Sequence, residues 1–165
     1  MKLAALLSVA AGLALGAPSP AAAAAAAPAK DGQKFGNWVA SCAPAPKNDC
    51  LLVQTQVLEG GARLLELTVG KAGTKGEYAA IAMLPLGIHI PSGVILVIDG
   101  KQSPMTLLKC SHDGCQAVAP LGKANAALLA KAKTILIGMV DEVTRKPVTI
   151  TVSPDGLSAG MAALK

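Results

Sequence analysis

Six side chains of this sequence could carry metal or redox chemistry, namely four cysteines and two histidines. The cysteines form two closely spaced pairs, Cys42 with Cys50 and Cys110 with Cys115, and His112 lies inside the second pair. Neither pair has the C-x-x-C spacing that lowers a thiol pKa for disulfide exchange. In an oxidising compartment such pairs form structural bridges. We therefore expect two disulfides, Cys42–Cys50 and Cys110–Cys115, and neither a bound metal nor a cofactor.

The start of the chain supports an oxidising compartment, because it has the pattern of an export signal. Lys2 precedes the mainly apolar stretch Leu3 to Leu15, which has the length of a signal-peptide core. A membrane span needs about 20 strongly apolar residues, which makes an uncleaved anchor the less favoured alternative. The alanine run 21–27 offers several A-x-A cleavage sites. We predict a signal peptide over 1–27, with an approximate cleavage site, and a periplasmic, surface-associated or secreted protein.

The part of the chain after the signal has the size of one domain. Residues 28–33 predict a short disordered leader, and the folded domain is expected over 34–165. Removing Lys2 with the signal lowers the formal charge from +5 to about +4. The remaining basic residues are scattered, which together with export argues against nucleic acid as a partner. No cysteine before Cys42 could carry a lipid anchor, so we expect at most peripheral membrane association.

Alternating apolar residues and turn residues predict an all-β sandwich. In 62–69, for example, Leu65, Leu67 and Val69 share one face. The run 94–98 is continuously apolar and predicts a strand that is covered on both faces. Further strands are predicted at 35–42, 51–58, 78–84, 105–110, 116–121, 134–140 and 147–152. A helix is expected at 123–133, and a short second one after residue 156.

The connections between these strands also carry information. Asp113-Gly114 supplies hairpin turn chemistry, which would place Cys110 opposite Cys115 at a separation that a disulfide spans. Prolines and a glycine in 85–91 exclude a regular central strand, and we expect this segment to cross between sheets.

Several of these features, in this order, resemble the invasion-associated locus B family of exported bacterial envelope proteins. The resemblance spans about residues 34–165 and is carried by the two cysteine pairs and by the segments Phe35-Gly-Asn-Trp38, Leu84-Pro-Leu-Gly87, Gly93 to Gly100 and Thr151-Val-Ser-Pro-Asp-Gly156. One departure is Leu157, where the family usually has an aromatic residue. The resemblance implies an immunoglobulin-like β-sandwich, association with the bacterial surface and, for some members, host-cell entry. It transfers no catalytic residue.

Catalytic patterns are missing from the sequence, which contains no nucleophile elbow, zinc-protease motif or phosphate loop. His89 is interpreted as a packed or surface histidine, and Trp38 as a core anchor. Asp141-Glu142 beside Arg145-Lys146 predicts a solvated turn. We therefore expect no enzymatic activity.

Two functional hypotheses follow. The first is a non-enzymatic envelope protein that acts through contacts with an envelope or host protein, in an oligomeric state that the sequence leaves open. The alternative is a periplasmic carrier of a small apolar ligand, in which the irregular segment Leu84 to Pro91 borders a pocket.

Overall fold

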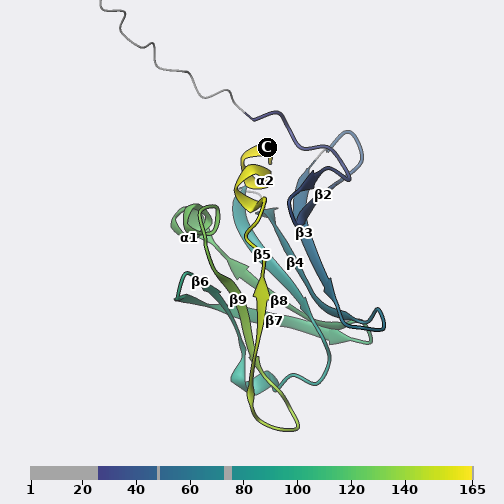
Figure 1. Ribbon diagram of the computed structural model, residues 1–165, viewed down its shortest axis with the longest axis vertical. Helices are drawn as coiled ribbons and strands as arrows, with labels where there is room; N and C mark the ends of the chain where they lie inside the picture. Colours follow the sequence, from purple (N-terminus) through teal and green to yellow (C-terminus); the bar gives the residue numbers. More distant parts are fainter. Residues whose placement is uncertain (1–25, 48, 73–75, 165) are drawn as a thin grey trace, which may run out of the picture.

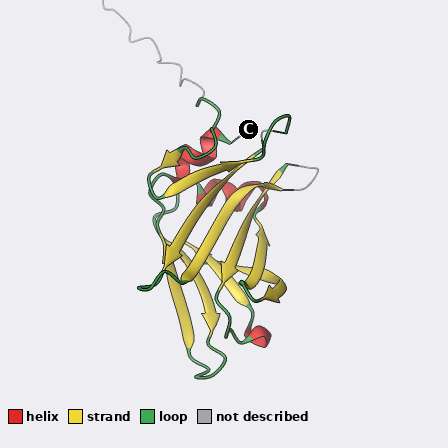
Figure 2. Cartoon of the chain, turned by 90° about the vertical axis from the view of Figure 1, so that its right-hand side faces the viewer, coloured by secondary structure: helices red, strands yellow, loops and turns green. Residues whose placement is uncertain are grey.

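Antiparallel β-structure forms the body of the protein, and two short α-helices lie together at one end of it (Figures 1 and 2). The structure is a computed structural model that describes residues 26–47, 49–72 and 76–164. The predicted signal peptide over 1–27 lies outside the described residues except for its last two. The strands are β1 (Lys34–Phe35), β2 (Trp38–Cys42), β3 (Cys50–Val57), β4 (Arg63–Ala72), β5 (Glu77–Leu84), β6 (Val94–Ile98), β7 (Lys101–Ser111), β8 (Gly114–Pro120), β9 (Ile135–Val140) and β10 (Pro147–Val152).

The described strands follow the order β1-β2-β3-β4-β5-β8-β7-β6-β9-β10, and every named pairing is antiparallel. The long strand β7 divides the strand order into two halves, β1 to β5 with β8 on one side and β6, β9 and β10 on the other. It joins them, because residues 101–105 pair with β6 and residues 106–111 pair with β8. The segment 85–93 crosses from β5 to β6 and contains the 3₁₀ helix η1 (Ile90–Ser92), as its prolines and glycines predict. The all-β class with short helices is confirmed.

The core is aliphatic and receives side chains from both halves and from both helices, α1 (Gly122–Leu129) and α2 (Leu157–Ala163). The predicted face of β4 is correct, since Leu65, Leu67 and Val69 are all buried. Trp38 is fully buried within this core and acts as an anchor there. Because burial of aliphatic surface is the main driving force for folding, the alternation of the strands specifies this arrangement.

Two sequence expectations about strands are wrong in detail. The predicted first strand 35–42 is split into β1 and β2, because the chain turns at Gly36-Asn37, where Gly36 has a φ of 54°. The strand β6 is not covered on both faces: its residues alternate between buried and partly exposed, with Ile95 and Val97 on the outer face. The outer face of β6 is therefore partly accessible to solvent.

Residues 28–33 differ from the disordered leader expected there. Ala29 N donates to Ala163 O at 3.0 Å, and Gly32 N donates to Ala40 O at 2.8 Å. The carboxylate of Asp31 accepts a hydrogen bond from Cys42 N at 2.9 Å. These contacts attach the segment to both β2 and the end of α2.

Candidate functional site

Two of the family segments, Phe35-Gly-Asn-Trp38 and Thr151-Val-Ser-Pro-Asp-Gly156, come from opposite ends of the domain sequence and lie in contact in the structure. Ser153, just after β10, is the centre of this contact. Its carbonyl oxygen accepts hydrogen bonds from Trp38 Nε1 at 2.9 Å and from Gln54 Nε2 at 3.0 Å. Its N–H donates to Gln54 Oε1 at 2.9 Å, and its hydroxyl accepts from Asn37 Nδ2 at 2.7 Å. We refer to this set as the polar junction, formed by Asn37, Trp38, Gln54, Gln56, Thr151 and Ser153.

The polar junction joins β3 to β10 through side chains where the two strands share no backbone ladder. Gln54 is the only buried polar residue in the described part of the chain, with an exposed fraction of 6%. Gln56, two residues further along β3, donates to Thr151 O at 2.7 Å. Just beyond β10, Gly156 has a φ of 83°, and a Cβ atom there would overlap the carbonyl of Phe35. The junction therefore depends on both hydrogen bonds and close backbone approach.

The chemistry of the junction is that of a structural contact. No charged side chain belongs to it, and every buried side-chain nitrogen or oxygen in the described residues has a hydrogen-bond partner. A cavity of about 410 Å³ borders it, lined by the same neutral amides and hydroxyls together with Thr55. Because these groups bond to one another, they are not aimed at a missing reactant.

The cysteines and the histidines have separate partners in the structure. As predicted, Cys42–Cys50 and Cys110–Cys115 form two disulfides between residues that lie directly opposite in their ladders. Their Cα–Cα distances are 3.9 and 4.0 Å. His112 is exposed and lies 3.1 Å from the carboxylate of Asp113. Over the described ranges, no three His, Cys, Asp or Glu residues converge as they would around a metal ion.

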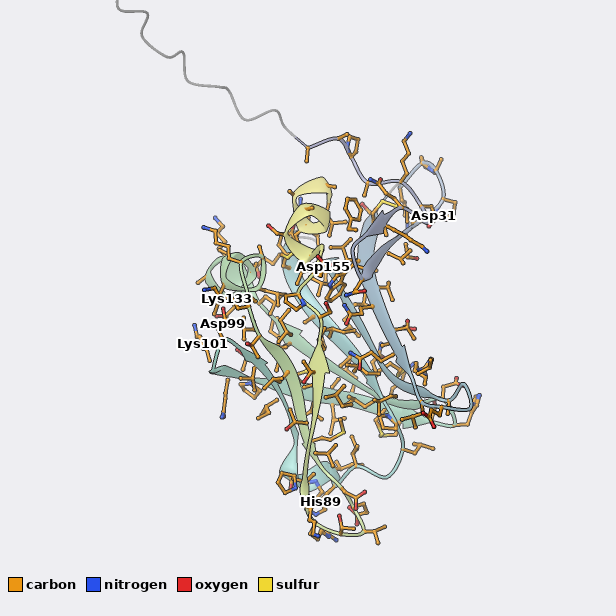
Figure 3. All side chains as sticks on the ribbon, in the orientation of Figure 1. Asp31, His89, Asp99, Lys101, Lys133 and Asp155 are labelled. Carbon is orange, nitrogen blue, oxygen red and sulfur yellow. A yellow bond between two sulfur atoms is a disulfide. The ribbon has the colours of Figure 1, made fainter. Side chains whose placement is uncertain are left out.

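The opposite end of the molecule from the helices is formed by two connected loops, residues 85–93 and 141–146, which we call the tip (Figure 3). His89 N donates to Val140 O at 2.7 Å, and Glu142 N donates to Gly87 O at 2.8 Å. An isolated β-bridge pairs Ile88 with Asp141. The side chain of His89 is used within its own loop, where Nδ1 lies 2.7 Å from Ser92 Oγ. The tip is thus a hydrogen-bonded unit.

Large aliphatic side chains are exposed on this unit. The exposed fractions of Leu86, Ile90 and Val143 are 57%, 56% and 88%, and Val148 at the start of β10 is 40% exposed. Several exposed aliphatic side chains on one unit suit the binding of a partner, because burial of their surface is favourable. The sequence analysis placed Leu86 and Ile90 in the irregular segment Leu84 to Pro91, as the border of a pocket, and did not predict their exposure. It did not single out Val143 or Val148; the available signal was bulky aliphatic residues within loops that otherwise contain proline, glycine and charge.

The charged residues of the tip compensate one another, in agreement with the solvated turn predicted there. Arg145 Nη2 lies 3.1 Å from Glu142 Oε1. Asp141 Oδ1 accepts hydrogen bonds from both the N–H and the hydroxyl of Thr144, each at 2.7 Å. Because these bonds favour the ionised carboxylate, they hold the pKa of Asp141 below its ordinary value.

The fold and the motifs identify the family. The model of the invasion associated locus B (IalB) protein family matches residues 38–165, and the chain belongs to this family. The crystal structure of invasion associated protein B from Bartonella henselae is similar, with a TM-score of 0.68 and 19% sequence identity, and the match covers 78% of this chain and 91% of that one. At this identity the likeness shows a shared fold. None of the curated proteins matches.

Two further observations concern the setting in which the protein works. Disulfides persist in oxidising compartments outside the cytoplasm, and both cysteine pairs form them. Among the residues that the structure describes, neither α-helix has the length and apolarity needed to cross a membrane. Membership of the family and the disulfides together support an invasion-associated envelope protein.

Proposed function

We propose that this protein is a non-enzymatic envelope protein that acts through contact with another protein, and that the tip makes this contact. The observation that carries the proposal is the group of exposed aliphatic side chains on the tip, Leu86, Ile90 and Val143. They project from two loops that hydrogen bonds hold together. A prearranged apolar surface loses little conformational entropy on binding and gains the burial of its aliphatic area.

Charge favours a protein partner over an anionic membrane. The tip carries two acidic residues, Asp141 and Glu142, and two basic residues, Arg145 and Lys146, so its formal net charge is zero. The charge of Arg145 is further satisfied by Glu142. Attraction to anionic lipid needs an excess of basic residues, which the tip lacks. An apolar pocket on a protein in the bacterial envelope or on a host cell matches this surface better.

The proposed location is the periplasm or the outer surface, after removal of the signal peptide. The two disulfides support a compartment outside the cytoplasm. The compartments differ in the partners they offer, since a periplasmic protein meets envelope proteins and a surface protein also meets host proteins. Crosslinking in bacteria alone and in bacteria mixed with host cells separates the two cases.

The proposal is tested by site-specific photocrosslinking in living cells. A photoreactive residue at Leu86 is compared with one at Leu108, which lies on β7 and has the same exposed fraction of 57%. We expect a discrete crosslinked protein from position 86 that is absent from position 108. The substitution Val143→Ser should weaken this crosslink without changing the melting temperature, because Val143 is 88% exposed.

Three results would count against the proposal. Equal crosslinking from positions 86 and 108 would show that exposure alone determines the products. No protein product from position 86 in either setting, or products that consist of lipid, would exclude the tip as a protein-binding surface.

A further inference from the structure

A groove separates the two α-helices at the end of the molecule opposite the tip. Its volume is about 430 Å³, which falls within the range of small-ligand sites. One wall is the face of α1 that carries Ala126, Ala127 and, just after the helix, Ala130; Met161 of α2 lies on the other wall. Ala126 and Ala127 border the same face because they lie four and three positions before Ala130. Small side chains on that face leave the space between the helices open.

An uncharged aromatic residue also lines the groove. Tyr78, at the start of β5, contacts the groove and donates its hydroxyl hydrogen bond to Met161 O at 3.2 Å. Burial raises the pKa of Tyr78, so its phenol stays neutral at physiological pH. The flexible thioether of Met161 adapts to ligands of different shape. The interior therefore suits a flexible apolar group.

One positive charge, that of Lys123, lies on the lining of the groove, and Lys101 and Lys133 lie near α1 without lining it (Figure 3). Lys123 lines it and has no carboxylate within ion-pair distance among the described residues. Lys101 reaches the same helix and donates to Asn125 Oδ1 at 2.9 Å. Figure 3 places Lys101 and Lys133 beside α1, with Asp99 between them. The carboxylate of Asp99 is occupied by the backbone N–H groups of Lys133 and Thr134 at 2.9 and 2.8 Å.

We propose that this groove binds a single acyl chain with an anionic headgroup, the chain lying between α1 and α2 and the headgroup at Lys123. The ammonium group of Lys123 on the lining complements an anion. A three-turn amphipathic helix would occupy about 1,200 Å³, which the groove could not enclose. The proposal is independent of the tip. It also relocates the apolar-ligand site that the sequence suggested at Leu84 to Pro91, since those residues do not line this groove.

Isothermal titration calorimetry on delipidated full-length mature protein tests the proposal, with decanoate below its micelle concentration as the probe. Ala127→Leu fills the groove and should weaken binding by about tenfold. Ala124→Leu is the matched control, because Ala124 is exposed on the same helix but does not line the groove. Lys123→Gln should weaken decanoate binding about threefold and leave binding of neutral decanol unchanged, whereas Lys131→Gln should change neither.

The outcomes decide between a site and non-specific adsorption. Should Ala127→Leu fail to fold, Ser158→Leu narrows the groove from α2 and carries the same expectation. Absence of saturable decanoate binding, or equal weakening by Ala127→Leu and Ala124→Leu, would overturn the groove as the site. Equal affinity for decanoate and decanol, unchanged by Lys123→Gln, would overturn the assignment of the anionic headgroup.

Discussion

The polar junction and the tip are two contacts between distant segments, and they differ in where their side chains point. At the junction, Gln54 and Trp38 are buried and donate hydrogen bonds to the carbonyl oxygen of Ser153. At the tip, backbone groups connect the two loops, while Leu86 and Val143 remain in solvent. The family segments Phe35-Gly-Asn-Trp38 and Thr151-Val-Ser-Pro-Asp-Gly156 lie at the junction, whereas Leu84-Pro-Leu-Gly87 runs into the tip. Family motifs in this protein therefore occur in both regions, and it is the exposure of the side chains that separates the structural contact from the candidate binding surface.

The difference has a physical cause. A buried amide such as Gln54 that loses its partner costs the full desolvation penalty, so only a few residue types suit the junction. An exposed aliphatic position such as Val143 tolerates many residues as far as stability is concerned. The constraint on the tip comes from its partner. Variants that separate folding from binding should therefore map to the two regions differently.

The largest expected contrast is between two glycines with similar φ angles. Gly156→Ala should destabilise the protein by about 4 kcal/mol, because the left-handed conformation disfavours alanine and its Cβ would overlap the carbonyl of Phe35. Gly87 at the tip has a φ of 89° but open space around its Cβ position. Gly87→Ala should therefore lower the stability by only about 1 kcal/mol. Chemical denaturation followed by Trp38 fluorescence measures both. Equal losses would contradict the distinction between the two regions.

The disulfide Cys42–Cys50 is expected to have the next largest effect, since it joins the two strands that carry Trp38 and Gln54. In the loop-entropy model, replacing both cysteines by alanine costs about 2.5 kcal/mol. The bridge Cys110–Cys115 closes a shorter loop, so the corresponding replacement of both cysteines by alanine should cost about 2 kcal/mol.

Thermal unfolding of the two double variants provides the measurement for the disulfides. We also expect the fluorescence of the single tryptophan to change more on loss of the Cys42 bridge than on loss of the other. A melting temperature unchanged by either replacement would show that the bridges do not stabilise the domain.

Two glutamines on β3 provide the next comparison. Gln54→Leu removes both hydrogen bonds to Ser153 and leaves the partly buried Ser153 N–H without its acceptor, while the carbonyl keeps Trp38 Nε1, at a cost of about 2 kcal/mol. Gln56→Leu removes one bond to Thr151 from a half-buried position and should cost about 0.5–1 kcal/mol. Denaturant titration of the two variants tests the order. A larger loss from Gln56→Leu would place the energetic centre of the junction on Thr151 instead of Ser153.

The sequence predicts features whose causes are local. Alternation places Leu65 and Leu67 in the core, and Asp113-Gly114 turns the hairpin that brings Cys110 opposite Cys115. The division of the first strand was missed because a glycine in an apolar run does not by itself specify a turn. The exposed outer face of β6 was missed because a continuous apolar run does not state how many layers surround it.

Long-range contacts were beyond the reach of such patterns. Trp38 and Ser153 are 115 positions apart, and only the order of the strands brings them together. The tip depends in the same way on the pairing of Ile88 with Asp141. Its exposed aliphatic residues follow from this tertiary arrangement, since the sequence alone does not tell whether Leu86 is buried.

The smallest expected effect is a pH dependence confined to the tip. The lowered pKa of Asp141 means that its hydrogen bonds to Thr144 stabilise the turn at pH values above the ordinary carboxyl pKa. This stabilisation should decrease as the pH falls below about 4 and disappear once the pH has fallen through the lowered pKa. NMR titration of the Val143 amide would follow the turn, while Trp38 fluorescence at the junction should stay constant over the same range.

A variant of Thr144 sharpens this last test. Thr144→Val removes the hydroxyl donor but keeps the backbone N–H that also bonds to Asp141, so the acid transition at Val143 should move to higher pH without being abolished. Thr144→Ser retains a hydroxyl and should titrate like the unmodified protein. Coincident curves for all three proteins would mean that the hydroxyl does not hold the carboxylate, and that the tip is fixed by its backbone contacts to residues 87 and 89 alone.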